Sequence, residues 1–517
     1  MVQVRKILVC LALAVATAKQ VHAQASPYLP LDDVAYEYVD ALMSRGMLRG
    51  LSALERPYHV AQIRAAIDSL ASDSSAQSGA VRGYVDVLSH TIARYETRKR
   101  NDPPGTRAPF RAKASFDFYA TGQTSSLREL MLADWHADVK PGIAGYFVMG
   151  AGHLTSSVRA LLDNRLNTDP EFEGRKDRSI AGRVEDAYLS GQWKYAEASF
   201  GRVGRSWGPI GFSGLQLGDD AYTYDHFYGR FGTDRIHIGM VAARVENYVF
   251  APGNETHRYF SAHRLGIRRG GFEMGLSESY LYTGVDRGLE FSLINPFNVF
   301  ALSWRNERTD GNLSFGGDAS YRTKNFGTFS ADVLLDDVQI DKCDSSCNEP
   351  SSYGLTVSAE GLPLAKNQKL FASYTRISNL AYRTPNVAET YEVRGVGLGR
   401  GFSDYDEIRV GTDLALIPRT PLRMYFAHRR QGEGDYRNPF PPEADYPKTP
   451  VFLSGVVWTT NRLAVSGASV IAKELQIAGD GGVNFSQNRF HIEGLSKTRF
   501  EGRVKVMWVP RWLIRFD

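Results

Sequence analysis

The sequence predicts an all-β transmembrane barrel of antiparallel strands with a small N-terminal α-helical periplasmic domain. Apolar residues follow a helical period from Leu31 to about Tyr95, and strand-like alternation of apolar and polar residues then runs for about 400 residues. After the first 23 residues, no apolar run approaches the ~18 residues of a membrane helix. We therefore divide the chain into a signal peptide (1–23), a periplasmic helical bundle (24–104) and an outer-membrane β-barrel (105–517).

The first residues have the features of a secretory signal peptide. Arg5 and Lys6 precede an apolar run from Ile7 to Ala18, and Val21-His22-Ala23 resembles a small-residue cleavage site. The alternative is an uncleaved anchor, for which the apolar run is short. We expect the protein to be exported.

Composition further narrows the class of protein to which this chain could belong. The chain has 61 Lys and Arg residues against 57 Asp and Glu residues, a formal net charge of +4, which does not indicate a nucleic-acid partner. The mean hydropathy of −0.30 argues against helical membrane spans after the signal. Export without such spans leaves a soluble exported protein or a transmembrane barrel.

Two cysteines follow the signal, in DKCDSSCNEP. In an oxidising compartment Cys343 and Cys347 could close a small disulfide loop. A metal site beside the neighbouring acids is the second interpretation, but two cysteines lack the usual four-ligand set. Free thiols are the third. We predict the disulfide and no metal.

The helical region should form three short helices. Apolar residues share helical faces in three sets: Leu31, Val34, Tyr38 and Leu42; Val60, Ile63, Ile67 and Leu70; Val81, Tyr84, Leu88, Ile92 and Tyr95. A bundle of this size supports little core by itself, so we expect it to pack on something larger. A linker with Asp-Pro-Pro and Gly follows, from about Thr97 to Arg107.

The C-terminal segment RVKVMWVPRWLIRFD shows the strand pattern most plainly. Even positions from Val504 to Phe516 are apolar, and basic residues stand at odd positions: Arg503, Lys505, Arg511 and Arg515. In a membrane barrel the apolar face looks outward into lipid and the charged face lines a wet lumen. Pro510 cannot donate to the ladder and should lie at a bulge or near a strand end.

Soluble β-sandwiches are the alternative to a barrel. Three features favour the barrel: the chain is 12% aromatic with aromatic residues crowding strand ends, turns alternate between short and long, and the last strand is long and aromatic. Sandwiches would give no reason for such a terminal strand.

The densest motif is ASFGRVGRSWGPIGFSGLQLGDD. Trp207-Gly208-Pro209 predicts a turn with an exposed indole, near Arg202 and Arg205. An indole can stack on a sugar face, and arginines can bind the carboxylates of an acidic polymer. The alternative is a girdle tryptophan beside lumenal arginines that form a structural ladder.

Four segments in order resemble the capsule-assembly Wzi family of outer-membrane proteins: GRVGRSWGP, SESYLYTGVDRGLEFSLINPFNVF, WRNERTDGNLSFGGDASYR and the strand ending LLDDVQID. The resemblance covers roughly residues 194–340. It implies a barrel of roughly eighteen strands with a helical bundle at the N-terminus, which retains exported capsular polysaccharide at the cell surface. The positions that match the family pattern are Arg205, Trp207, Gly208, Pro209, Asn295, Pro296, Asn306, Glu307, Asp336 and Asp337.

The helical region also resembles a single S-layer homology module, in LDDVAYEYVDALMSRGMLRGL followed by RPYHVAQIRAAI. Such modules grip polymers attached to peptidoglycan, usually as several copies. The resemblance therefore implies a peptidoglycan-linked polymer as a further partner of this region.

Catalytic motifs are absent from the sequence, and the acid pairs Asp219-Asp220 and Asp336-Asp337 would point to opposite faces of a strand. The leading hypothesis is a non-enzymatic barrel without cofactor that binds capsular or other surface polysaccharide. We take its site to be Arg202, Arg205, Trp207, Asn306, Glu307, Asp336 and Asp337, and its other partners to be outer-membrane lipid and the barrel-assembly machinery. The rival hypotheses are a pore for small solutes and a barrel enzyme that uses Asp336 or Asp337.

Overall fold

The computed structural model of the protein describes residues 25–72, 79–97, 110–134, 136–307, 311–323, 325–337, 349–472, 474–510 and 514–516. The predicted signal peptide, Cys343 and Cys347 lie outside these residues, as does the predicted domain boundary near residue 104.

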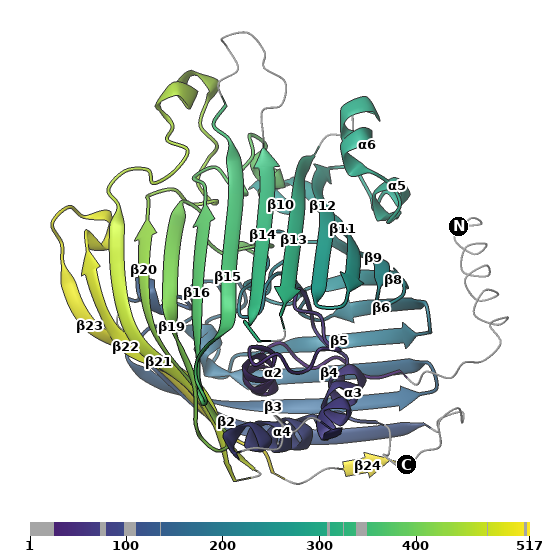
Figure 1. Ribbon diagram of the computed structural model, residues 1–517. Coiled ribbons are helices and arrows are strands. Elements are labelled where there is room, and N and C mark those ends of the chain that lie inside the picture. The colour runs from purple at the N-terminus through teal and green to yellow at the C-terminus, as the bar shows by residue number, and fades with distance from the viewer. Residues whose placement is uncertain are drawn as a thin grey trace, which may run out of the picture.

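One large antiparallel sheet closes on itself into a barrel (Figure 1). Its strands are β2 (Arg111–Gln123), β3 (Asp138–Ala151), β4 (Leu154–Asp163), β5 (Gly182–Gln192), β6 (Ala196–Arg202), β8 (Asp225–Gly232), β9 (Ile236–Arg244), β10 (Tyr248–Ala251), β11 (Asn254–Arg269), β12 (Phe272–Gly284), β13 (Asn312–Arg322), β14 (Thr328–Asp337), β15 (Ser352–Ala365), β16 (Gln368–Ile377), β19 (Tyr405–Ile417), β20 (Thr420–Gln431), β21 (Trp458–Ala472), β22 (Leu475–Gln487), β23 (Lys497–Trp508) and β24 (Ile514–Phe516).

The ring closes where the first wall strand meets the last. β2 pairs with β3 on one side and with β23 and β24 on the other. Because β24 continues β23 along β2, and β10 continues β9 along β11, the described residues form a ring of 18 strands. Pro510 lies in the gap between β23 and β24, as its missing N–H requires.

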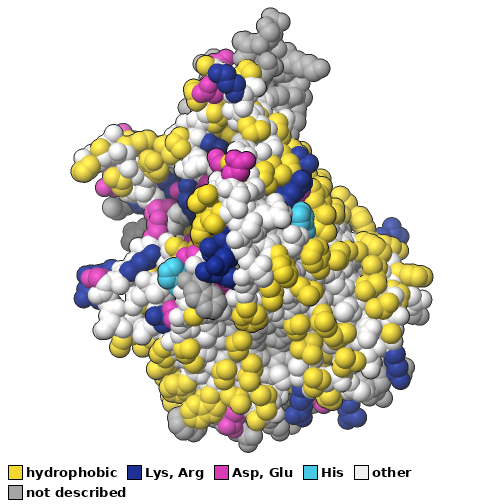
Figure 2. Space-filling model, turned by 90° about the vertical axis from the view of Figure 1, so that its left-hand side faces the viewer, with side chains coloured by type: hydrophobic (Ala, Val, Ile, Leu, Met, Phe, Trp, Pro, Cys, Tyr) yellow, Lys and Arg dark blue, Asp and Glu magenta, His cyan; other side chains and the backbone are white. Residues whose placement is uncertain are grey.

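Apolar side chains cover the outside of the wall, and polar side chains face inward. On β23 the indole of Trp508 is 42% exposed, and Val504 and Val506 share its face, whereas Glu501 is buried. Arg258, Arg429 and Arg462 are among the largest fully buried side chains. Figure 2 shows hydrophobic side chains spread over a broad part of the outer surface. The predicted orientation is confirmed for β23, whereas Arg515 of β24 is exposed like its two neighbours and Arg511 lies outside the described residues. A belt of this kind matches the membrane interior.

Short turns connect the strands at one end of the barrel and long loops at the other. The β3–β4 turn consists of Gly152 and His153, whereas residues 203–224 connect β6 to β8 and residues 378–404 connect β16 to β19. In outer-membrane barrels the short turns are periplasmic and the long loops extracellular. Residues 285–311, between β12 and β13, carry α5 (Phe291–Ile294) and α6 (Phe300–Glu307) at the long-loop end.

The N-terminal helices are α2 (Ala35–Met43), α3 (Val60–Asp68) and α4 (Gly79–Ile92), which confirms the predicted helical pattern. They lie at the short-turn end of the barrel (Figure 1). Their apolar faces share one core with inward side chains of the wall, such as Tyr146 and Val470. The N-terminal segment with these helices, described at residues 25–72 and 79–97, therefore fills this end of the lumen. We call this segment the plug. Among the described residues, no helix is long and apolar enough to cross a membrane.

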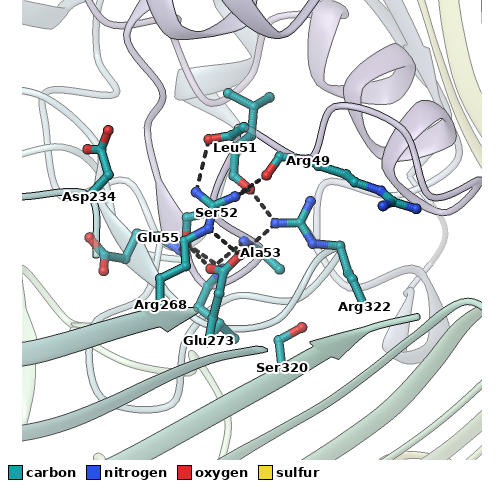
Figure 3. A network of polar contacts seen from close by, with 12 residues as sticks. Arg49, Leu51, Ser52, Ala53, Glu55, Asp234, Arg268, Glu273, Ser320 and Arg322 are labelled. Carbon is teal, nitrogen blue, oxygen red and sulfur yellow. Dashed lines mark hydrogen bonds and ion pairs between the residues drawn. The ribbon is translucent and has the colours of Figure 1, made fainter. Parts of the chain in front are cut away.

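A buried polar network fastens this plug to the wall (Figure 3). Glu273 Oε2 accepts hydrogen bonds from the Ser52 hydroxyl (2.8 Å) and from the Ala53 N–H (3.0 Å). The same carboxylate pairs with Arg322, at 2.6 Å. Arg268 donates to the carbonyl oxygens of Gly50 (2.9 Å) and Leu51 (3.2 Å). The buried charges are thus paired and also hydrogen-bonded to the plug, as burial demands.

Two long loops fold into the lumen from the other end. The first carries β7 (Ser206–Trp207), which pairs with β1 (Glu55–Arg56) of the N-terminal segment. The second carries the hairpin of β17 (Glu392–Val393) and β18 (Val396–Gly397). Tyr382 and Tyr391 of the second loop donate to the carbonyl oxygens of Leu215 (2.7 Å) and Gln216 (2.6 Å) in the first. The lumen is therefore occupied from both ends.

Short 3₁₀ turns complete the description: η1 (Ser69–Ser72), η3 (Leu130–Leu132), η4 (Asn164–Asn167), η5 (Val387–Glu389), η6 (Glu443–Lys448) and η7 (Arg489–His491).

Candidate functional site

The indole of Trp207 is buried, so the expectation of an exposed indole at this turn is wrong. Only 5% of the residue is exposed, and it packs in an apolar cluster with Leu215, Leu217 and Tyr382. The backbone N–H of Trp207 donates to the carbonyl oxygen of Leu217, at 2.8 Å. The β1–β7 pairing excludes water from the ring, which sequence could not reveal because the partner strand lies about 150 residues away.

Arg205 is buried as well and holds the N-terminal segment against the wall. Its guanidinium donates to His226 Nε2 (2.9 Å), to the Tyr28 hydroxyl (3.1 Å) and to the Ser199 hydroxyl (3.0 Å). It also lies 3.6 Å from the ring centroid of Tyr228. These contacts match the structural alternative for this arginine, because they use most of its donors.

Arg202 lies on the opposite side of the wall. It is two residues from the outward-facing Phe200 and pairs with Asp225 at 2.8 Å. Arg202 and Arg205 therefore do not act on one ligand, although they are three residues apart.

Gly208 and Pro209 shape the turn after Trp207. A Cβ on Gly208 would come within 2.7 Å of Gly214 Cα, so only glycine permits this close backbone approach. The Gly208 N–H donates to the carbonyl oxygen of Leu54 (2.9 Å), and the Pro209 carbonyl accepts from the Phe212 N–H (3.0 Å). These contacts join the turn to the N-terminal segment, and the predicted role of the motif stays a prediction.

Asn295 and Pro296 connect α5 to α6 on the outside of the barrel (Figure 1). The Asn295 side chain accepts from the Phe297 N–H, at 3.1 Å. Asn306 and Glu307 end α6, and their side chains lie outside the described part of the structure.

One residue of each acid pair accepts a hydrogen bond from the loop of residues 378–404. Asp336 accepts from the Tyr382 N–H (2.7 Å), and Asp220 accepts from the Gly401 N–H (2.8 Å). Asp337 ends β14, and its side chain is not among those described. The predicted site residues are thus spread over the lumen, the outer wall and the loops, and they do not form one site.

A second constellation, whose lining includes one predicted site residue, Arg205, lies beneath the long loops. A cavity of about 440 Å³ is enclosed by the β2, β4 and β5 walls and by residues of three loops, 124–137, 164–181 and 203–224. It reaches from Asp32 beside the plug to Arg128, whose side chain is 30% exposed. The cavity therefore connects the plugged lumen with solvent at the long-loop end.

Tyr222 forms the centre of this cavity. The guanidinium carbons of Arg128 and Arg183 each lie 4.2 Å from its ring centroid. Arg128 pairs with Asp169 (3.3 Å) and Glu171 (2.9 Å), and Arg183 pairs with Glu185 (2.9 Å). The Tyr222 hydroxyl donates to Asp169. The result is an aromatic ring between two cations, with carboxylates at its edge.

Burial and neighbouring charges determine the protonation states of Tyr222 and Asp32 in this cavity. It raises the pKa of the Tyr222 phenol, which therefore stays neutral and keeps its donor O–H. Burial would likewise raise the pKa of Asp32 at the far end of the cavity, but Arg159 and Lys505 oppose it and hold the pKa at about 2. Asp32 is thus ionised at neutral pH and pairs with Arg159 at 2.6 Å.

The cavity offers the chemistry that a carbohydrate needs. Guanidinium groups donate to hydroxyl or carboxylate oxygens, and carboxylates accept from hydroxyls. Among the described residues, no group of three or more His, Cys, Asp or Glu side chains is placed to hold a metal ion. Sequence reasoning missed Arg128, Asp169 and Tyr222, because each comes from a different loop and none belongs to a local motif.

No protein-family model and no curated protein matches the sequence. The structure is similar to that of Wzi of Escherichia coli, an outer-membrane protein involved in group 1 capsule assembly and described as a carbohydrate-binding β-barrel. The TM-score is 0.62 at 13% identity, and the match covers 93% of this chain and 99% of that chain.

Two outer-membrane proteins of Pseudomonas aeruginosa are less similar. OprD has a TM-score of 0.43 at 8% identity, over 79% of this chain and 94% of its own. OpdK has a TM-score of 0.44 at 10% identity, over 79% of this chain and 99% of its own. The similarity to Wzi confirms the fold that the sequence resemblance implies, a closed antiparallel barrel with N-terminal helices.

Proposed function

We propose that this protein is an outer-membrane barrel that binds exported capsular or other surface polysaccharide and retains it at the cell surface. The observation that carries the proposal is the Tyr222 ring held between Arg128 and Arg183 in a cavity beneath the long loops. A polymer at the cell surface reaches this end of the barrel first. The carbohydrate binding described for the similarly folded Wzi supports the same chemistry.

The filled lumen favours a binding role over the rival role of a solute pore. A pore needs a continuous aqueous path, whereas here the helices, β7 and the β17–β18 hairpin occupy the interior. In the same proposal, the apolar belt contacts outer-membrane lipid, the terminal aromatic strands engage the barrel-assembly machinery, and the plug faces the periplasm. Binding of a peptidoglycan-linked polymer by the helices stays a prediction.

The test is surface-glycan retention in a deletion strain of the native host. Cell-bound and shed polysaccharide are compared after complementation with wild type, with Tyr222→Ala plus Arg128→Ala, or with the exposed pair Arg175→Ala plus Tyr195→Ala as a control. We expect wild type and control to restore retention and the cavity variant to shed polymer. Equal retention by all three, with equal amounts of folded barrel, would contradict the proposal.

A further inference from the structure

The hairpin of α5 and α6 lies on the outer wall of the barrel rather than over its mouth (Figure 1). Leu293 and Phe300 of the hairpin pack against three tyrosines of the wall: Tyr259, Tyr280 and Tyr282. These tyrosines are buried although they lie on the outward face of the wall. Tyr259 shares that face of β11 with the exposed Leu265 and Ile267, and Tyr280 and Tyr282 share it on β12 with the exposed Leu276. The hairpin therefore covers part of the outward face.

The side chains of Glu278 and His263 on the outer wall fix the position of the hairpin. Glu278 Oε2 accepts from the Phe300 N–H at the start of α6 (2.7 Å) and pairs with His263 at 3.2 Å. The His263 ring lies 4.3 Å from the Phe300 ring. A carboxylate on this face would be costly in hydrocarbon without such partners. The wall is thus built to receive the hairpin here.

An apolar groove of about 860 Å³ lies between the tip of the hairpin and the wall. Its volume is within the range of about 300–1,000 Å³ that is typical of small-ligand sites. The side chains that line it are mostly apolar and come from the tip and from strands β8 to β14; they include Phe231, Ile236, Leu276, Phe297, Phe315 and Leu335. All six are exposed, and the five from the wall belong to the outward belt. The groove is continuous with the surface that faces the membrane.

We propose that this groove holds an acyl chain of a lipid from the surrounding bilayer. The belt already places hydrocarbon against Leu276 and Phe315, and the hairpin adds a second apolar wall through Phe297, which is 69% exposed. An acyl chain in the groove contacts protein on two sides, whereas lipid elsewhere on the belt contacts it on one. Contact with more apolar surface gives a longer-lived association. The α5–α6 hairpin is then a lateral clamp for one lipid.

The experiment uses the full-length barrel in liposomes of phosphatidylethanolamine and phosphatidylglycerol, doped with a phosphatidylethanolamine that carries a photoreactive diazirine on its acyl chain. After irradiation, mass spectrometry maps the labelled peptides. We expect labelling of residues 296–299 and of the β12 segment around Leu276 at least about fivefold above the belt around Leu463. Even labelling along the belt, or selective crosslinking of the groove to a protein instead, would overturn the proposal.

Leu276→Trp fills the groove, and Leu463→Trp is the matched control on β21, because the two leucines are 58% and 60% exposed on the same outward face. We expect the first variant to lose the labelling of residues 296–299 and the second to keep it. Phe297→Ser removes the second wall without touching a barrel strand and serves if Leu276→Trp fails to fold, which heat-modifiable gel mobility reports. Undiminished labelling in a folded groove variant would refute the clamp.

Discussion

Glu55 and Trp207 face each other in a two-residue antiparallel ladder inside the barrel. One belongs to the N-terminal plug and the other to a loop from the opposite end. The Glu55 carboxylate also pairs with Arg264 of the wall and with His237, at 2.8 Å from Nε2. Plug, loop and wall are thereby joined at one point, so closure of the lumen is part of the folded core.

Replacing Glu273 with Gln should destabilise the folded barrel by about 3–5 kcal/mol, because it leaves the buried Arg322 without its counter-charge. The midpoint of urea unfolding in detergent measures the loss. Asp177→Asn is the control, since Asp177 forms a solvent-exposed pair with Arg175 and should leave the unfolding midpoint where it is in the wild type. Equal midpoints for both variants would show that the network of Figure 3 does not fasten the plug.

Trp207→Ala should cost about 3–5 kcal/mol of stability, because it empties a packed apolar site. Trp508→Ala is the comparison, since its indole lies on the outward face, where lipid replaces the lost contacts, and the cost should be smaller. Urea unfolding of both variants, refolded into liposomes, decides the matter. A stable Trp207→Ala barrel with lost glycan binding would instead restore Trp207 as a sugar contact.

The fold was largely predictable because the alternation of apolar and polar residues within each wall strand indicates which side faces lipid and which faces the lumen. Alternation in RVKVMWVPRWLIRFD gave the outward face of Val504 and Trp508, and Pro510 gave the break before β24. The helical period likewise located α2, α3 and α4. Both patterns depend only on residues that are close in the chain, so they can be recognised without knowing which strands or loops contact them in the fold.

The site was not predictable for the opposite reason. Arg128, Asp169 and Tyr222 meet only after three loops fold together, and the environment of Trp207 depends on a partner strand near residue 55. A Trp-Gly-Pro turn is predicted to be exposed when the distant segments that bury it are unknown. The residue types of a polysaccharide site could be predicted from the sequence, but the sequence does not distinguish the structural arginines from the others.

The wild-type barrel should conduct little in planar bilayers, because the loop of residues 378–404 is hydrogen-bonded into the lumen through Tyr382 and Tyr391. Deleting residues 385–399 removes Tyr391 and the β17–β18 hairpin, and deleting residues 25–97 removes the N-terminal plug, so the two deletions together should raise single-channel conductance. Deleting the exposed residues 440–447 is the control and should leave the barrel closed. A large conductance of the unaltered protein would revive the pore.

Acidification should weaken the anchorage of the plug only well below neutral pH. The pKa of Asp32 is held at about 2 against an ordinary value of 3.8, so the folded state binds a proton less readily than the unfolded state. The stabilisation by the Asp32–Arg159 pair is therefore complete above about pH 4 and is lost as pH falls toward 2. Asp32→Asn should flatten this part of the stability–pH curve, which urea unfolding at pH 2 to 6 measures. An unchanged curve would show that other carboxylates dominate it.

Tyr222 separates the role of its ring from that of its hydroxyl in the proposed glycan site. Tyr222→Ala removes the ring that contacts the guanidinium groups of Arg128 and Arg183, so both groups lose their fixed positions, and glycan binding should weaken about tenfold, equal to about 1.4 kcal/mol. Tyr222→Phe keeps the ring but loses the hydroxyl that reaches Asp169, and it should weaken binding only about threefold, within the usual worth of one hydrogen bond. Calorimetric titration with polysaccharide purified from the host measures both, and Tyr195→Ala at the short-turn end should bind as wild type does. If Tyr222→Phe lost as much affinity as Tyr222→Ala, the hydroxyl and its contact with Asp169 would organise the cavity, and the contacts of the ring with the two arginines would not.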